Sequence, residues 1–254
     1  ASAADDLGIE TAAGSRRVAK TLTKRIHKAR ARGLRVGRLA RINPKAQRLG
    51  LVGTHKQQSY GHTAQGASTR QVQWMRSNLK VGTVMGNNQA CTTSTLAWVY
   101  SPSDDPAVSL RVEQIATWID IWINSDGAKR NRIRKCWRTK LPKIGLKLSQ
   151  KWSVACGPVS ATICSLYEAG WQPLTPSRWL AGDSMATIDG AAHNKSHIIC
   201  QFQKDLISVL WAKASSHPHS TGCGKGVDFH PARKAKASLI KEGNFAAARA
   251  LDYL

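Results

Sequence analysis

Apolar residues recur at helical spacing along most of this 254-residue chain. The clearest pattern lies in residues 107–124, where one apolar face extends over the whole segment and is wider than a narrow stripe. This face holds Val108, Val112, Ile115, Ile119 and Trp122, widened by Leu110, Trp118 and Ile121. We therefore expect this helix to be central in the core.

The same spacing, together with Pro and Gly as boundary signals, predicts most of the remaining elements. Helices are expected at 44–60, 68–84, 92–100, 159–169, 198–214, 231–241 and 245–254. Residues 61–67 and 215–230 are predicted to be loops, and residues 6–10 a short strand or turn. Apolar pairs on both sides of Gly182 and Asp183 predict a small hairpin within 178–189. The fold class is therefore mainly α: a helical bundle with basic N-terminal helices and one small β-hairpin.

Residues 15–48 combine helical spacing with a one-sided charge. They contain thirteen Lys or Arg and no Asp or Glu, and no acidic residue occurs between Glu10 and Asp104. One arc of the expected helix is apolar: Val18, Leu22, Ile26, Ala29, Val36 and Ala40. A second arc is basic: Arg17, Lys20, Lys24, Lys28, Arg32, Arg35 and Arg38. Gly33 and Gly37 each weaken a helix by roughly 1 kcal/mol relative to Ala, so we expect a break there.

A second basic run covers residues 129–151, with ten Lys or Arg, and no acid occurs between Asp126 and Glu168. The formal net charge is +23 and the pI about 10.3. Such an excess points to nucleic acid first and an anionic membrane surface second, although an idle basic surface is an alternative. Trp137 lies within the run and Trp152 directly follows it, and they could either stack on bases or anchor the core.

We predict that both basic stretches contact RNA, DNA or both. Their positive charges repel one another, and binding of a polyanion would neutralise them. The predicted nucleic-acid-binding residues are Arg16, Arg17, Lys20, Lys24, Arg25, Lys28, Arg32, Arg35, Arg38, Lys129, Arg130, Arg132, Arg134 and Lys135. No run of eighteen apolar residues occurs, so no transmembrane helix and no membrane partner are expected.

Metal and catalytic centres are not expected from the sequence. The six Cys are irregularly spaced without a Cys-x-x-Cys pair, which is typical of reduced thiols in an intracellular protein, nuclear or cytoplasmic. The histidine-rich part matches no usual zinc spacing, and a zinc-dependent nuclease remains an alternative. Its potential ligands are His193, His197, Cys200, His217, His219, Cys223 and His230. With fifteen Asp and Glu and no paired aspartates in an apolar strand, no catalytic residue and no cofactor are predicted.

Several short motifs occur in a characteristic order. They are Asp6-Leu7-Gly8-Ile9 followed by Gly14-Ser15-Arg16-Arg17, then Tyr60-Gly61, Gly157-Pro158-Val159, Ala169-Gly170-Trp171 and Leu210-Trp211-Ala212. This order resembles the region after the catalytic palm in the polyproteins of non-LTR (LINE-type) retrotransposons. The resemblance covers most of the chain.

The resemblance implies that the parent protein is a reverse transcriptase, an RNA-directed DNA polymerase. Residues 1–103 would be a basic helical thumb-like region and residues 104–254 a helical connection region, which together grip the template–primer. The metal-binding aspartates and their Mg²⁺ would lie in the palm upstream of Ala1, and that palm would be a partner of this chain. The alternative is a stand-alone basic RNA-binding protein, for example of the ribosome.

Overall fold

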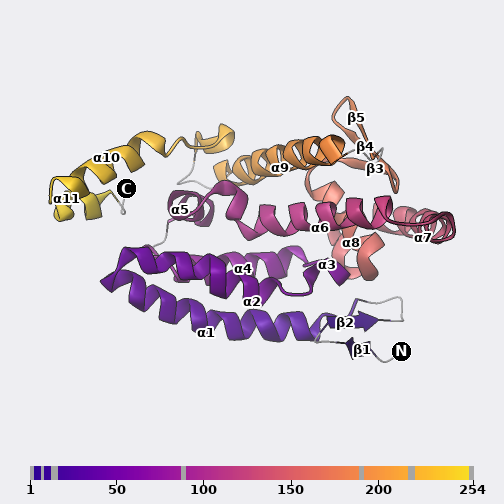
Figure 1. Cartoon of the computed structure of the whole chain (residues 1–254), viewed down its shortest axis with the longest axis horizontal. Coiled ribbons are helices and arrows are strands. Elements are labelled where there is room, and N and C mark those ends of the chain that lie inside the picture. The colour runs from indigo at the N-terminus through magenta and orange to yellow at the C-terminus, as the bar shows by residue number, and fades with distance from the viewer. Residues whose placement is uncertain are drawn as a thin grey trace.

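The computed structural model describes residues 3–6, 9–12, 17–86, 90–188, 192–216 and 221–251. The fold is mainly α-helical and includes one small three-stranded antiparallel sheet, which confirms the predicted fold class (Figure 1). Within these ranges, every helix is too short or too polar to cross a bilayer.

The first half of the chain is a series of helices that begins with one long basic helix. Its elements are α1 (Lys20–Ile42), η1 (Pro44–Arg48), η2 (Gly50–His55), α2 (Lys56–Ser59), α3 (His62–Gln65), α4 (Thr69–Val81) and α5 (Thr92–Val99). The apolar arc of α1 is buried from Leu22 to Ala40, as predicted.

The predicted break in α1 is wrong, because Gly33 and Gly37 lie inside a continuous helix and are both buried. A Cβ atom on Gly33 would lie 2.5 Å from the carbonyl oxygen of Asn78, and one on Gly37 would lie closer still to that of Val81. The two glycines therefore let the α4 backbone pack directly on α1 (Figure 1). The side chain of Asn78 reinforces this contact by donating to the Ile26 carbonyl oxygen at 2.9 Å.

The segment after α1 is more irregular than expected. Residues 44–60, predicted as one helix, form a 3₁₀ turn, a π-helix and a short α-helix in succession. The pitch changes where the chain passes Tyr100, whose hydroxyl donates to the Gln47 carbonyl oxygen at 2.9 Å and fills the space of a side chain at Gly50. α3 forms in the predicted loop 61–67, and the buried ring of His62 at its start lies 3.1 Å from the Leu110 carbonyl oxygen.

The second half of the chain surrounds the most apolar helix. Its helical elements are η3 (Pro102–Asp104), α6 (Pro106–Ile123), α7 (Gly127–Gly145), η4 (Leu148–Ser153), α8 (Gly157–Glu168), α9 (Ala192–Ser215), η6 (Cys223–Lys225), α10 (His230–Lys241) and α11 (Phe245–Ala250). α9 thus begins earlier than predicted, and residues 252–254 of the last predicted helix lie outside the described residues.

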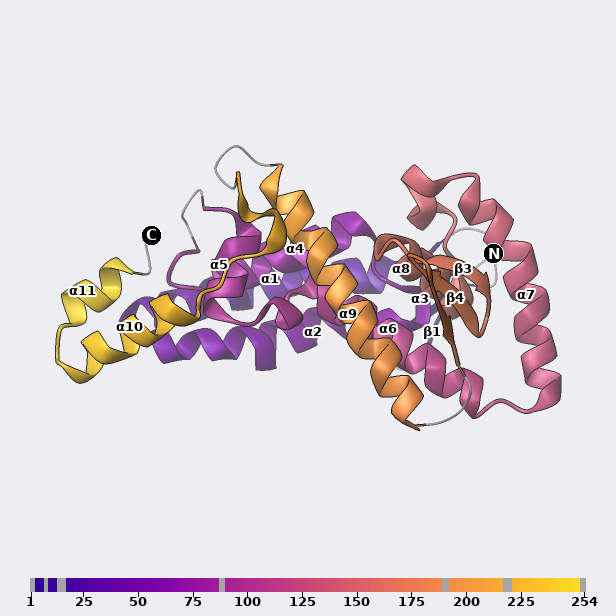
Figure 2. The ribbon, with the colours of Figure 1, turned by 90° about the horizontal axis from the view of Figure 1, so that it is seen from above.

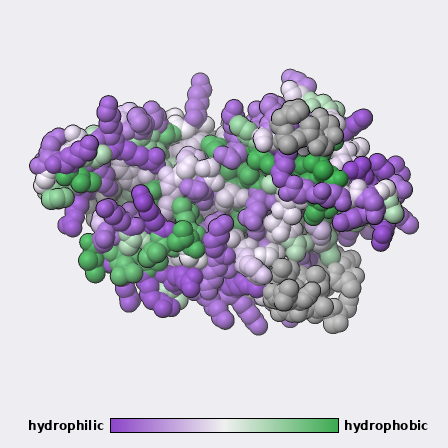
Figure 3. Space-filling model, viewed as in Figure 1, coloured by the Kyte–Doolittle hydropathy of each residue, from purple (hydrophilic) through white to green (hydrophobic). Residues whose placement is uncertain are grey.

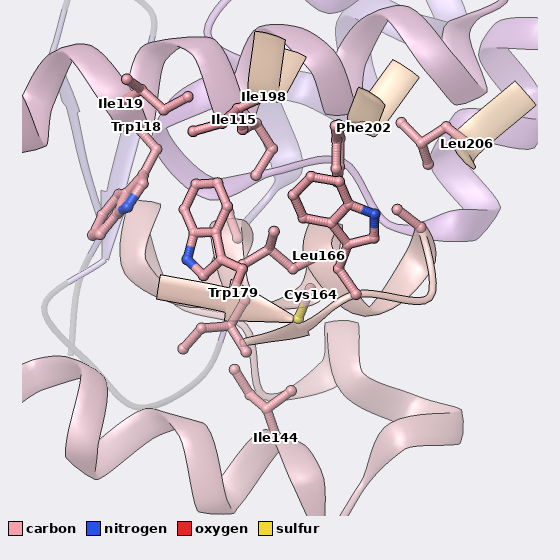
Figure 4. Close-up of a cluster of buried hydrophobic side chains, with 14 of the residues drawn as sticks. Ile115, Trp118, Ile119, Ile144, Cys164, Leu166, Trp179, Ile198, Phe202 and Leu206 are labelled. Atoms are coloured by element: carbon pink, nitrogen blue, oxygen red, sulfur yellow. The ribbon is translucent and has the colours of Figure 1, made fainter. Parts of the chain in front are cut away.

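α6 is central, as predicted, because it contributes to two separate apolar clusters. Leu110 packs with Leu22 and Ile26 of α1, whereas Ile115 and Ile119 belong to the larger cluster built from α6, α8, α9 and the sheet (Figure 4). The division of the chain near residue 103 stays a prediction.

The sheet contains one strand more than the predicted hairpin. Its strands are β3 (Gln172–Thr175), β4 (Arg178–Ala181) and β5 (Ser184–Thr187), in the order β3-β4-β5. The turn at Gly182 and Asp183 is where it was expected. β3 was not predicted because it contains Pro173, and a sheet tolerates proline mainly in edge strands. β3 is an edge strand, in which Pro173 lies opposite the buried Trp179 of β4. A further hairpin joins β1 (Ala3–Asp6) to β2 (Ile9–Ala12), where only a short strand or turn was predicted.

The elements form an elongated bundle. α7 and the three-stranded sheet lie at one end, and α10 and α11 at the other, with α9 between them (Figure 2).

The close contact of α1 with α4 can be tested with Gly37→Ala. On an exposed helix this change is favourable by about 1 kcal/mol. Here we expect it to lower the free energy of unfolding by about 1–3 kcal/mol, because the added methyl group meets a backbone carbonyl that cannot rotate away. Urea denaturation measures the difference. Gly127→Ala is the control, since its Cβ would meet no atom within 4 Å; equal stabilities of the two variants would contradict the packing.

Candidate nucleic-acid interface

The exposed side of α1 carries a row of cations. Its members, here called the α1 basic face, are Lys20, Lys24, Lys28, Arg32, Arg35 and Arg38, and all six are exposed. Hydrophilic side chains project along the lower edge of the molecule in Figure 3, where α1 lies in Figure 1. At 1.5 Å per residue the row is roughly 27 Å long. That length corresponds to about eight nucleotide steps of one strand of a duplex.

Four of the predicted arginines in or just before this helix make hydrogen bonds within the protein. Arg32 and Arg35 donate only long bonds, to the carbonyl oxygens of Gly53 at 3.3 Å and Ala31 at 3.4 Å. Arg17 donates from Nη2 to the Gly66 carbonyl oxygen at 2.5 Å and to Oε1 of Gln71 at 2.7 Å. Arg25 donates to the Tyr60 carbonyl oxygen at 3.0 Å and lies 4.8 Å above the centre of the Tyr60 ring. Arg17 and Arg25 therefore hold the segments around Gly66 and Tyr60 against α1, in addition to carrying positive charge. The side chain of Arg16 lies outside the described residues.

α7 is a ridge that projects cations in several directions, because only Trp137 and Ile144 along its length are buried. Lys129, Arg132 and Lys135 are exposed, and their side chains make no hydrogen bond or ion pair with any described residue. Their ammonium and guanidinium groups are therefore available to a partner.

The other two predicted residues of α7 contact the end of α6. Arg130 donates to the Ile123 carbonyl oxygen at 3.1 Å, where it binds an unsatisfied carbonyl of the last turn of α6. Arg134 donates to Oδ1 of Asn131 at 2.9 Å, and its guanidinium lies 5.5 Å from the centre of the Trp122 ring.

A basic groove connects the start of α1 with the second half of α7. Arg17, Lys140, Lys143 and Lys147 line this cavity of about 480 Å³, and no carboxylate of the described residues lines it. We call it the α7 groove. The three lysines were not predicted as site residues, although they belong to the same basic run, since the prediction stopped at Lys135. They recur every three to four residues, and this helical spacing could have indicated that they share one side.

None of the predicted lysines forms an ion pair with a described residue, and neither do Arg32, Arg35, Arg38, Arg130, Arg132 and Arg134. The acids pair with other cations, in Arg76–Asp105 at 2.8 Å, Arg111–Glu168 at 2.6 Å and Lys195–Asp120 at 2.5 Å. Asp105 also accepts from the Ala107 backbone N–H as the N-cap of α6. These pairs were missed, because nothing local in the sequence indicates which cation will meet a distant acid.

The carboxylate of Glu168 lies where α4, α6 and the segment after α7 meet, between the two basic segments. We call this place the junction. Its carboxylate accepts from Nε of Arg111 at 2.6 Å, Nε1 of Trp152 at 2.7 Å and Oγ1 of Thr69 at 3.0 Å. Burial alone would raise the pKa of Glu168. The Arg111 guanidinium, the Trp152 indole N–H and Lys151 nevertheless hold that pKa below its usual value, so the carboxylate is charged at neutral pH.

Trp152 links this junction to the basic surface. The guanidinium of Arg111 lies 4.4 Å from the centre of its ring, and that of Arg17 lies 5.7 Å away. Trp137 is 1% exposed and Trp152 7%. Both are therefore core anchors, and the alternative that they stack on bases is wrong for this conformation.

The zinc alternative involves residues that the structure only partly describes. His217 and His219 lie outside the described residues, as does the side chain of His193. Within the described ranges, no three His, Cys, Asp or Glu side chains gather as metal ligands would. Comparison of the chain with protein-family models, curated proteins and solved structures gave no match.

We expect Glu168→Gln to destabilise the fold at pH 7 by about 3–5 kcal/mol, because it leaves the buried Arg111 without its counter-charge. The pKa of Glu168 is lowered in the folded state, so its stabilisation is present above the ordinary pKa of 4.5 and is lost as the pH falls below it. The difference between parent and variant should therefore shrink in acid.

Urea denaturation at pH 7 and near pH 3.5 measures both effects. Asp120→Asn is the control, because its exposed pair with Lys195 should contribute less than about 1 kcal/mol. If the two variants were equally stable at pH 7, Glu168 would not be the central carboxylate.

Proposed function

We propose that this chain binds the phosphate backbone of nucleic acid through the α1 basic face, the exposed cations of α7 and the α7 groove. The observation that carries the proposal is the charge arrangement. The cations of the α1 basic face are exposed, and no acidic residue occurs between Glu10 and Asp104 to neutralise them. Such a row is relieved of self-repulsion when phosphates neutralise it, and the released counterions favour binding.

The arrangement favours backbone contacts over base recognition. The α1 basic face is a row of flexible side chains on one helix, and the Trp residues beside the α7 groove are buried. Contacts with phosphates position a protein on nucleic acid but carry no sequence information. We therefore propose that RNA, DNA and hybrid duplexes bind with little sequence preference.

We further propose that the chain is the template–primer-binding segment of a retrotransposon RNA-directed DNA polymerase. The order of motifs from Asp6-Leu7-Gly8-Ile9 to Leu210-Trp211-Ala212 supports this parent protein. In that case the reading frame that precedes Ala1 encodes a palm with paired metal-binding aspartates. Sequencing the genomic locus tests the proposal, and a start codon directly before Ala1 would favour a stand-alone RNA-binding protein instead.

The binding surface is tested by changing Lys20, Lys24, Lys28 and Arg32 together to Gln. We expect weaker binding to a primer–template duplex of any sequence. The slope of log affinity against log salt should also flatten by roughly 0.7–0.9 for each phosphate that the variant no longer neutralises. The helix propensity of Gln is close to that of Lys and Arg, so α1 should persist. Fluorescence anisotropy at several salt concentrations measures both quantities.

A matched variant separates this surface from total charge. Four exposed lysines lie on α9 and α10, namely Lys204, Lys213, Lys234 and Lys241. Changing them to Gln removes the same number of positive charges as the first variant. This control should keep a salt slope close to that of the parent. Identical slopes in all three proteins would show that the α1 basic face is idle.

A further inference from the structure

A second basic cavity lies on the other flank of α7, between this helix and the start of the sheet. It has a volume of about 330 Å³, and its lining includes Arg134 and Arg138 of α7 and Arg178 of β4. No carboxylate of the described residues lines it. We call it the arginine pocket. Its lining shares no residue with that of the α7 groove, which includes Lys140, Lys143 and Lys147.

Two of the three arginines are not used by the fold. The guanidinium groups of Arg138 and Arg178 make no hydrogen bond or ion pair with any described residue, whereas that of Arg134 lies against the Trp122 ring. The two available guanidinium groups come from segments forty residues apart, and the fold brings them to one cavity. Arginine forks match phosphate oxygens with paired N–H donors, which makes a phosphate the best-suited anion.

The neutral part of the wall is both aromatic and polar. Trp122 and Trp137 line the pocket together with Thr175 and Ser177. The indole N–H of Trp137 is buried and has no hydrogen-bond partner among the described residues. The pocket volume falls at the lower end of the range for small-ligand sites. A pocket of this volume is larger than a lone phosphate needs. A phosphate with an attached nucleotide fits these dimensions and surfaces better.

Charge decides between an internal and a terminal phosphate. An internal phosphodiester carries one negative charge. A terminal phosphate ester carries about 1.5–2 negative charges near pH 7, as a phosphorylated side chain does. A cavity with three guanidinium groups and no acid among its described lining residues therefore favours the terminal group.

We propose that the arginine pocket binds the phosphorylated end of a nucleic-acid strand. This inference rests on the proposed function, because the strand is held by the α1 basic face and the exposed cations of α7. Arg138 and Arg178 bind the terminal phosphate, and the exposed side chains of Leu174 and Thr175 in the wall receive the end nucleotide.

The test compares three oligonucleotides of one sequence, labelled at an internal base. One has hydroxyl groups at both ends, one a 5′-phosphate and one a 3′-phosphate. We expect the full chain to bind one of the phosphorylated strands about tenfold more tightly than the unphosphorylated strand, since charge-assisted hydrogen bonds at this end are added. The preferred strand identifies which end the pocket accepts. Equal affinity for all three overturns the inference while leaving the proposed function intact, whereas binding to none overturns both.

Variants locate the preference in the pocket. Changing Arg138 and Arg178 together to Gln should abolish the tenfold ratio, while the unphosphorylated strand is still bound. Changing Arg132 and Lys135 to Gln removes the same charge from the exposed side of α7, outside the pocket lining. That control should weaken the binding of all three strands and keep the ratio. A ratio that survives in the first variant, or disappears in both, overturns the assignment.

Discussion

The ion pair between the half-buried carboxylate of Glu168 and the buried Arg111 is the interaction on which the arrangement of the two basic segments depends. The carboxylate binds Arg111 of α6, Trp152 after α7 and Thr69 of α4, so it connects three parts of the chain at one point. Arg17 then reaches the Trp152 ring from the start of α1. Charge at Glu168 is tolerated inside because each oxygen has a donor and Arg111 supplies the opposite charge. Removal of that carboxylate would loosen the junction at which the α7 groove forms.

The small number of acids determines where the cations are available. Asp105 and Glu168 neutralise buried arginines, and Asp120 pairs with Lys195 at the surface. Among the described residues, no carboxylate forms an ion pair with the α1 basic face or with Lys129, Arg132 or Lys135. Folding therefore concentrates uncompensated positive charge on these two helices, at a cost in self-repulsion that a polyanion removes.

The features predicted correctly from the sequence are those set by the spacing of residues within one segment. The predictions were wrong or missing where a feature depends on contact with a distant segment. The apolar arc of α1, the central position of α6 and the β4–β5 turn all follow from spacing along a single segment. Gly33 has two physical meanings, a weak point in a helix or a site of close packing, and only the α4 backbone decides between them. The lysines of the α7 groove were visible in the basic run. The arginine pocket was not, because Arg178 lies forty residues from Arg138 and no local pattern relates them.

The way in which α7 is anchored explains why two separate basic cavities border it. At about 100° per residue, its buried residues Trp137 and Ile144 lie on one line along the helix. Lys140 and Lys143 fall on one side of that line, where Arg17 and Lys147, which follows the helix, complete the α7 groove. Arg134 and Arg138 fall on the other side, where the sheet contributes Arg178. A helix buried along a wide face would have covered one of these flanks. Because α7 is anchored along a single line, the α7 groove and the arginine pocket can lie on opposite flanks of the same helix.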